Sequence, residues 1–252
     1  AWLPYMAASQ ALKRIVQLLP DEALASIFPM MQNLINSGEF NERFAGLCLL
    51  SHIIKNADNS LIGIPFLSVL FEKINDQASI VAFQSIKCIQ NLMMRFFDSI
   101  DERTEEEKGQ LSPVIQNCYE VSMAILSMAD SSISEGKAQV QAAITEEGHI
   151  SPLFLKAASL LSEITRMPQY PHTQASLQAL LQLGLKTKEP KLFECISKVI
   201  DLGTDQASVV SFFPVLLEAL NAAIQQQVTF WAMHDIGENI QAYLAKYAAN
   251  IQ

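Results

Sequence analysis

The chain has 252 residues, of which 50% are hydrophobic and 17% are charged, and its formal net charge is −9. This apolar composition excludes a disordered chain, and the acidic balance argues against direct nucleic-acid binding, because a phosphate backbone needs clustered Lys and Arg. No apolar run approaches the length of a membrane span and no signal peptide is visible, so we expect no membrane insertion.

The first half of the chain predicts two pairs of helices. Apolar residues between Leu24 and Ile35 follow the i, i+3, i+4, i+7 spacing of an amphipathic helix, and Asp21 is its expected N-cap. The turn Asn36-Ser37-Gly38 predicts a break before the next helix. The expected helices cover 21–35, 41–56, 60–74 and 79–97, followed by a polar loop over 98–110.

The second half continues the helical spacing without any strand-like alternation. Ser112-Pro113 and Ser151-Pro152 each predict an N-cap followed by Pro at the first helical position. The segment from Met167 to His172 predicts a linker. The expected helices cover 112–129, 134–146 (the weakest), 152–166, 173–187, 190–202, 206–222 and 225–248.

One sequence pattern occurs twice. Asp21 to Met31 reads DEALASIFPMM, and Gln206 to Leu216 reads QASVVSFFPVL. The two Pro residues are 214 − 29 = 185 residues apart, about five periods of roughly 40 residues, which predicts an α-solenoid of helix pairs. Pro29, Pro65 and Pro214 are then expected inside kinked first helices; alternatively, each helix begins nearer its Pro.

This pattern resembles HEAT repeats, whose first helix often bears a Pro and whose second helix has an Arg near its start. LINSGEFNERFAGLCLL supplies Asn36 and Arg43, whereas the second pair keeps Asn75 and Asp76 without an Arg. Among HEAT proteins the chain looks most like the importin-β (karyopherin-β) family. Three stretches support that resemblance: Trp2 to Ile15, Gln178 to Leu220, and Gln227 to Leu244.

The resemblance implies an all-α, right-handed superhelix of about six HEAT-type helix pairs. Residues 1–252 would form a single solenoid that is a piece of a longer array. It implies a nuclear transport receptor of the cytoplasm, the nucleus and the nuclear envelope pore. The implied partners are proteins: import cargo or an adaptor, nucleoporin Phe-Gly repeats, and the GTPase Ran.

The acidic run DSIDERTEEEKG is the candidate partner-binding segment. A functional interpretation is a patch for basic cargo, and the plainer one is a solvated loop between repeats. Its acidic residues are Asp98, Asp101, Glu102, Glu105, Glu106 and Glu107.

Other combinations of residues support neither catalysis nor a cofactor. Cys48 and His52 share a helix face, but no second Cys/His pair has matching spacing for zinc. Phe230 and Trp231 are expected in the core, and His234-Asp235 lacks a nucleophile context. With 9 Gly and no Gly-rich phosphate loop, we expect a chain that is not an enzyme.

The role of three lysines and two alternative families remain to be considered. Lys186, Lys188 and Lys191 form a small basic spot typical of a solvated turn. A rigid HEAT scaffold of the type-2A protein phosphatase kind would have more regular repeats with recurring Asp and Arg. A tubulin-binding TOG array would have Trp and basic residues on one row of turns, which the sparse Lys and Arg argue against.

Overall fold

The computed structural model describes residues 11, 14–59, 61–135, 151–168, 170–187 and 189–225. Within these ranges every regular element is a helix, and there is no strand. The chain divides into two compact units, residues 1–108 and 109–252. None of the helices in the described ranges is both long enough and apolar enough to cross a membrane.

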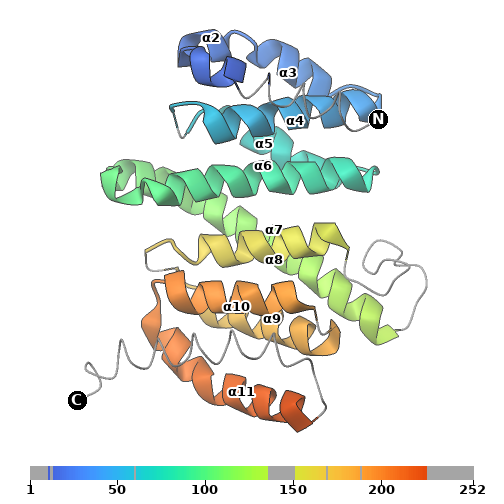
Figure 1. Ribbon diagram of the computed structural model, residues 1–252, viewed down its shortest axis with the longest axis vertical. Helices are drawn as coiled ribbons and strands as arrows, with labels where there is room; N and C mark the ends of the chain where they lie inside the picture. The colour runs from blue at the N-terminus through green and yellow to red at the C-terminus, as the bar shows by residue number, and fades with distance from the viewer. Residues whose placement is uncertain are drawn as a thin grey trace. The chain divides into compact units, whose positions relative to one another are not determined.

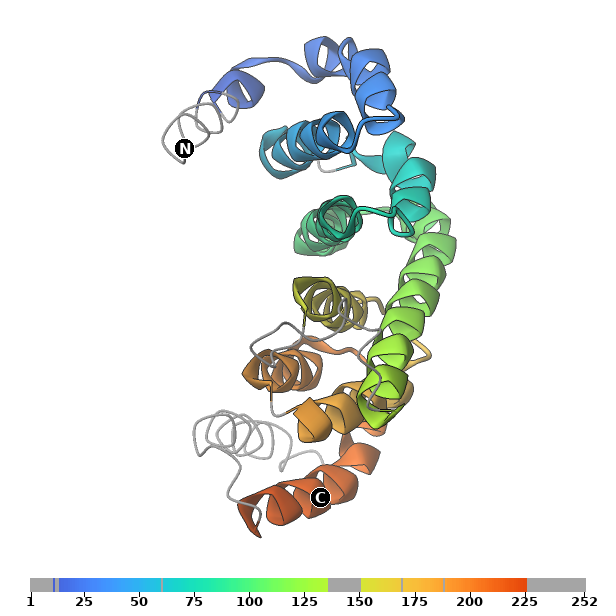
Figure 2. The same cartoon turned by 90° about the vertical axis from the view of Figure 1, so that its right-hand side faces the viewer.

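Unit 1 consists of helices that pack in neighbouring pairs (Figures 1 and 2). Helix α3 packs on α4, α5 packs on α6, and α4 and α6 pack on each other. The elements are α2 (Asp21–Ala25), α3 (Phe28–Ile35), α4 (Phe40–Asn56), α5 (Leu67–Lys73) and α6 (Ser79–Asp98), with short 3₁₀ turns η1 (Ile64–Phe66) and η2 (Ile100–Glu102).

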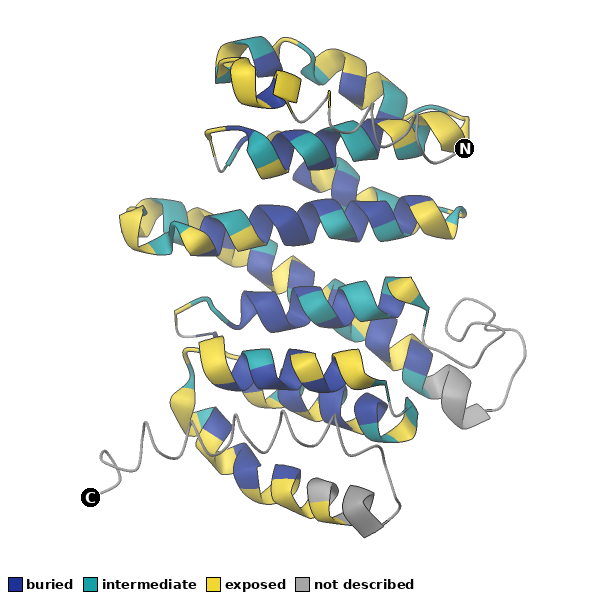
Figure 3. Cartoon of the chain, viewed as in Figure 1, coloured by how far each residue is buried: buried dark blue, intermediate teal, exposed yellow. Residues whose placement is uncertain are grey.

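The core of unit 1 lies where α4 and α6 meet. Leu47, Leu50 and Ile86 are fully buried, and Figure 3 shows α6 buried along most of its length. Gly46 allows α4 to approach α3, because a Cβ at this position would lie 2.9 Å from the Cβ of Leu34. The same apolar stripes that predicted the helices therefore supply the contact between them.

Unit 2 repeats this arrangement. Helix α8 packs on α10, α9 packs on α10, and α11 packs on α9. Its core contains Phe154, Leu180 and Ile196, all nearly inaccessible to solvent. The helices are α7 (Glu105–Glu135), which begins in unit 1 and continues in unit 2, α8 (Pro152–Ile164), α9 (Thr173–Thr187), α10 (Pro190–Leu202) and α11 (Gln206–Gln225).

The expected all-α class with helices in neighbouring pairs is confirmed. Helices α9 and α10 have the bounds that the sequence predicted. Ser151 is the N-cap residue of α8, with Pro152 as its first residue, and Pro214 lies inside α11 as expected.

Two of the three mid-helix prolines were predicted wrongly. The helix over 21–35 is interrupted between α2 and α3, so Pro29 is the second residue of α3. Pro65 lies in η1, ahead of α5. Proline is tolerated in a first turn, where its missing N–H has no partner to lose, so the alternative of helices that begin nearer the Pro is correct at both positions.

The start of α7 was also predicted wrongly. The run 98–110 is not a loop throughout, because η2 occupies part of it and α7 begins at Glu105, which places Pro113 inside the helix. The prediction missed a capping box at Thr104, whose hydroxyl accepts the Glu107 N–H (3.2 Å) while the Glu107 carboxylate accepts the Thr104 N–H (2.9 Å). Most of the predicted helix over 134–146, and nearly all of the one over 225–248, fall outside the described residues.

None of the four cysteines forms a disulfide. Cys88, Cys118 and Cys195 are buried, whereas Cys48 is half-buried. Burial raises the pKa of the Cys195 thiol to about 11 and raises the pKa values of Cys88 and Cys118 well above their ordinary range. These buried thiols are unreactive apolar side chains.

Candidate functional site

The structure places the acidic segment (Asp98, Asp101, Glu102, Glu105, Glu106 and Glu107) at the junction of α6, η2 and α7. Asp98 is the last residue of α6, Asp101 and Glu102 lie in η2, and the three other acids form the first turn of α7. Five of the six side chains are exposed, and Glu107 is half-buried. Carboxylates in the first turn of a helix also stabilise it through the helix dipole.

Glu107 and Glu105 have structural partners. Glu107 accepts hydrogen bonds from Thr104 and pairs with Arg103 at 3.5 Å. The Thr104 backbone N–H, the Thr104 hydroxyl and the Arg103 guanidinium together hold the pKa of Glu107 below its ordinary value. Glu105 pairs with Lys108 at 2.7 Å. Part of the acidic run therefore serves the start of α7.

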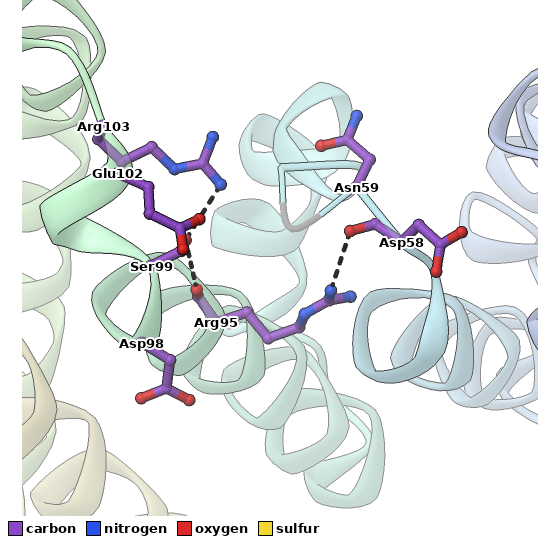
Figure 4. A pocket seen from close by; sticks show the side chains of 7 residues that line it. All are labelled: Asp58, Asn59, Arg95, Asp98, Ser99, Glu102 and Arg103. Atoms are coloured by element: carbon purple, nitrogen blue, oxygen red, sulfur yellow. Dashed lines mark hydrogen bonds between the residues drawn. The ribbon is translucent and has the colours of Figure 1, made fainter.

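A pocket of about 460 Å³ lies beside this segment (Figure 4). Arg95 donates to the backbone oxygens of Ile54 (2.7 Å) and Asp58 (3.3 Å), at the carboxyl end of α4. Arg103 donates to the Ser99 hydroxyl at 3.1 Å. The pocket is lined by Asp58, Asn59, Arg95, Asp98, Ser99, Glu102 and Arg103. Its three carboxylates outnumber its two guanidiniums, so the charge balance suits a basic group.

The Arg expected from the HEAT resemblance joins two successive helix pairs of unit 1. Arg43 donates from Nε (2.7 Å) and Nη2 (3.0 Å) to the two carboxylate oxygens of Asp76, and Nη1 donates to the backbone oxygens of Ser37 and Gly38. Burial alone would raise the pKa of Asp76, but hydrogen bonds from Arg43 and from the Ala78 N–H outweigh it and lower that pKa below its ordinary value.

Unit 2 contains a groove that the sequence did not predict. It lies between α7 and α9, has a volume of about 180 Å³, and is lined by Met123, Leu126, Ser127, Asp130, Ala179, Gln182 and Leu183. Four of these side chains are apolar. The spacing of 123, 126, 127 and 130 is visible as a helical stripe, but no sequence signal indicates that its neighbour is α9.

The sequence predicted that Lys186 lies in a solvated basic turn, but the structure gives it an acidic partner. Its Nζ forms an ion pair at 2.5 Å with Asp130, which lines the groove. Lys188 lies outside the described residues, and Lys191 is exposed at the start of α10. The pair therefore links α9 to α7.

The remaining sequence candidates do not form a site in the described part of the chain. No group of three or more His, Cys, Asp or Glu residues within those ranges could hold a metal ion, and Cys48 and His52 gain no third ligand there. Phe230, Trp231 and His234-Asp235 lie outside the described residues.

The chain resembles a known protein in its structure rather than in its sequence. No family model matches the chain, and no curated protein matches its sequence. The crystal structure of Kap121p is similar, with a TM-score of 0.52 and 18% sequence identity. The match covers 96% of this chain and 26% of Kap121p, so the chain spans about a quarter of the length of the protein that it resembles.

The likeness to Kap121p, an importin-β family protein, confirms the expected resemblance at the level of the fold. The chain is an all-α helical-repeat solenoid like that karyopherin. At 18% identity the likeness establishes the fold alone.

Proposed function

We propose that this chain is part of a nuclear transport receptor, which binds Phe-Gly segments of nucleoporins and protein cargo. The observation that supports this proposal best is the α7–α9 groove, a recess with four apolar lining residues in a helical-repeat scaffold that resembles Kap121p. A receptor of this kind works in the cytoplasm, in the nucleus and at the nuclear pore. The GTPase Ran is implied by the resemblance alone, and no described residue is assigned to it.

The α7–α9 groove has the size of one aromatic ring. A buried cavity of about 150 Å³ lined by apolar side chains can hold benzene, and this groove measures about 180 Å³. Burying one Phe side chain contributes roughly 1.5–3 kcal/mol, which is weak binding for a single site. Several such contacts along one chain give useful avidity while each releases quickly, as passage through a pore requires.

A peptide-binding experiment tests this use of the groove. A fluorescent peptide with Phe-Gly repeats should bind the 252-residue protein, and the same peptide with every Phe replaced by Ser should not. Ala179→Phe should fill the groove and abolish binding, because Ala179 is half-buried in its wall.

The matched control is Gln174→Phe, which adds the same ring at an exposed position of α9 that does not line the groove. This variant should bind like the wild type. Equal binding of the Phe and Ser peptides, together with capture of a phosphatase catalytic subunit in a pull-down, would instead support the rival scaffold of the type-2A phosphatase kind.

We assign cargo binding to the acidic segment and the adjoining pocket. Between Asp98 and Lys108 six acids face two basic residues, and a basic segment of cargo would meet this excess of negative charge. Neutralising three exposed acids with Asp101→Asn, Glu102→Gln and Glu106→Gln should weaken binding of a Lys-rich peptide and reduce its salt dependence.

The control neutralises three exposed acids of unit 2, with Glu194→Gln, Asp201→Asn and Glu218→Gln. The net charge changes equally in both variants, so only a local site predicts a difference between them. If both variants lose the same affinity, binding reflects overall charge and the assignment to the acidic segment fails.

A further inference from the structure

Two polar contacts join α7 to the α9 segment. Nearer the start of α9, His172 Nε2 lies 3.0 Å from Gln116 Oε1; beside the groove, Lys186 Nζ lies 2.5 Å from Asp130 Oδ1. Both pairs are 56 residues apart in the sequence. A constant offset means that α7 and α9 run parallel and in register between the two contacts. Because 130 − 116 and 186 − 172 both equal 14, the contacts are roughly 21 Å apart along the helices.

The contact at His172 is reinforced by aromatic packing. The rings of Tyr119 and His172 stack with centroids 4.0 Å apart and an interplanar angle of 8°. Tyr170, only 2% exposed, meets both rings edge-on, and its hydroxyl lies 3.3 Å from the Ser176 hydroxyl. Gln116 also donates to Glu120 at 2.9 Å. Several contacts in a partly buried setting hold α7 and the start of α9 at one spacing there.

The contact at Lys186 has a different character. The side chains of Lys186 and Asp130 are 42% and 38% exposed. An exposed ion pair is weak and is screened by salt. Asp130 also lines the groove, so a change in this pair alters the groove directly. The spacing of α7 and α9 is therefore fixed near His172 and adjustable near Lys186, beside the groove.

We propose that the Asp130–Lys186 pair is an adjustable strut that sets the width of the groove and thereby its affinity for an aromatic side chain. Both are positioning residues, which act through the spacing of α7 and α9. When the pair breaks, α9 moves away from α7 at this end and an inserted ring loses contact with one wall. The effect on affinity rests on the proposed function, whereas the effect on width does not.

The width is measured first, without any peptide. A ketone-bearing residue is introduced at position 128 of α7 and at position 178 of α9, and each is coupled to a nitroxide label. This chemistry leaves the native cysteines unmodified. Electron spin resonance then reports the distance between the two helices. The wild type should give a narrow distance distribution at low salt. Lys186→Asp places a second carboxylate beside Asp130, and the repulsion between them should broaden the distance distribution. The exchanged pair, Asp130→Lys with Lys186→Asp, should make the distribution narrow again.

The same proteins are then titrated with the Phe-Gly peptide. Lys186→Asp should weaken binding about fivefold, and the exchanged pair should restore it to within about twofold, as expected for one exposed ion pair. Added salt should weaken binding by the wild type and by the exchanged pair, but not by Lys186→Asp. Recovery in the exchanged pair would show that the weaker binding of Lys186→Asp does not come from a general loss of folding. Asp130→Lys alone breaks the same pair from the other side and should weaken binding in the same way.

An unchanged distance distribution in Lys186→Asp would overturn the strut, whether or not the peptide binds. Broadened distances with unchanged peptide affinity would overturn its role in binding. If the wild type binds no Phe-Gly peptide at all, the proposed function fails, and the distance measurement still decides whether the pair sets the width.

Discussion

Within each unit, charged side chains link successive helix pairs, but their surroundings differ between unit 1 and unit 2. In unit 1, Arg43 near the start of α4 reaches Asp76 in the turn before α6, and their side chains are 14% and 7% exposed. In unit 2, Glu163 of α8 is completely buried and pairs with Lys198 of α10 and with Arg166, whose side chains are 30% and 22% exposed.

The contrast shows that similar helix packing can be held by different electrostatic arrangements. Asp76 is surrounded by donors, because the Ala78 N–H also bonds to it at 2.9 Å. Glu163 depends on two partly exposed cations, and a buried carboxylate without such partners is costly. Arg43 bonds to the Asp76 carboxylate and to two backbone oxygens of unit 1, whereas the cations of unit 2 compensate a charge inside its core.

The largest expected effect is the loss of both cations in unit 2. Arg166→Met with Lys198→Met leaves the Glu163 carboxylate buried without compensation, and we expect a loss of about 3–5 kcal/mol in the free energy of unfolding. Urea denaturation followed by circular dichroism measures this loss. Adding Glu163→Leu should recover most of it, because three apolar residues can replace a buried ion cluster. No recovery would mean that packing, rather than the buried charge, causes the loss.

A smaller effect is expected for the pair in unit 1. Arg43→Ala removes two bonds to Asp76 and two to backbone oxygens, and should lower the free energy of unfolding by less than the loss expected in unit 2. The control is the double-mutant cycle with Asp76→Ala, in which the two losses should not add, since they share the interaction. Additive losses would show that Arg43 acts through the backbone of Ser37 and Gly38 alone.

The smallest expected effect is the contribution of Asp76 to the pH dependence of the free energy of unfolding at low pH. Its pKa is lower in the folded protein than in the unfolded chain, so its contribution is complete above about pH 4 and is lost as pH falls through the folded-state pKa. The wild type should therefore lose stability more steeply than Asp76→Asn below about pH 4. Unfolding in urea at a series of pH values measures both slopes, and parallel curves would contradict the assignment.

Helix positions in unit 2 could be predicted wherever local signals coincide with tertiary packing. Pro190 marks the start of α10, and the linker ahead of Thr173 marks the start of α9. The repeat period does not reveal where in its helix a proline lies. Pro29 is in the first turn of α3, whereas Pro214 lies inside α11. The start of α7 was predictable in principle, since Thr104 and Glu107 have the spacing of a capping box.

The candidate sites were less predictable. The capping-box spacing distinguishes Glu107 from the other acids of its run, but nothing local indicates that Asp98 and Glu102 line a pocket with Asp58. The groove needs Leu126 and Ala179 on facing walls, and the strut needs Asp130 beside a lysine 56 residues away. Such contacts leave no local signature, because each helix is amphipathic whichever neighbour it meets.

The sequence by itself determined that this protein is a stack of helix pairs, because apolar spacing and turn residues act within a few residues of one another. Only the tertiary structure decided which charges meet, as with Arg43 and Asp76 or Lys186 and Asp130. The physical reason is that a helix face specifies burial without specifying a partner, whereas an ion pair or a groove requires two distant segments in a particular register.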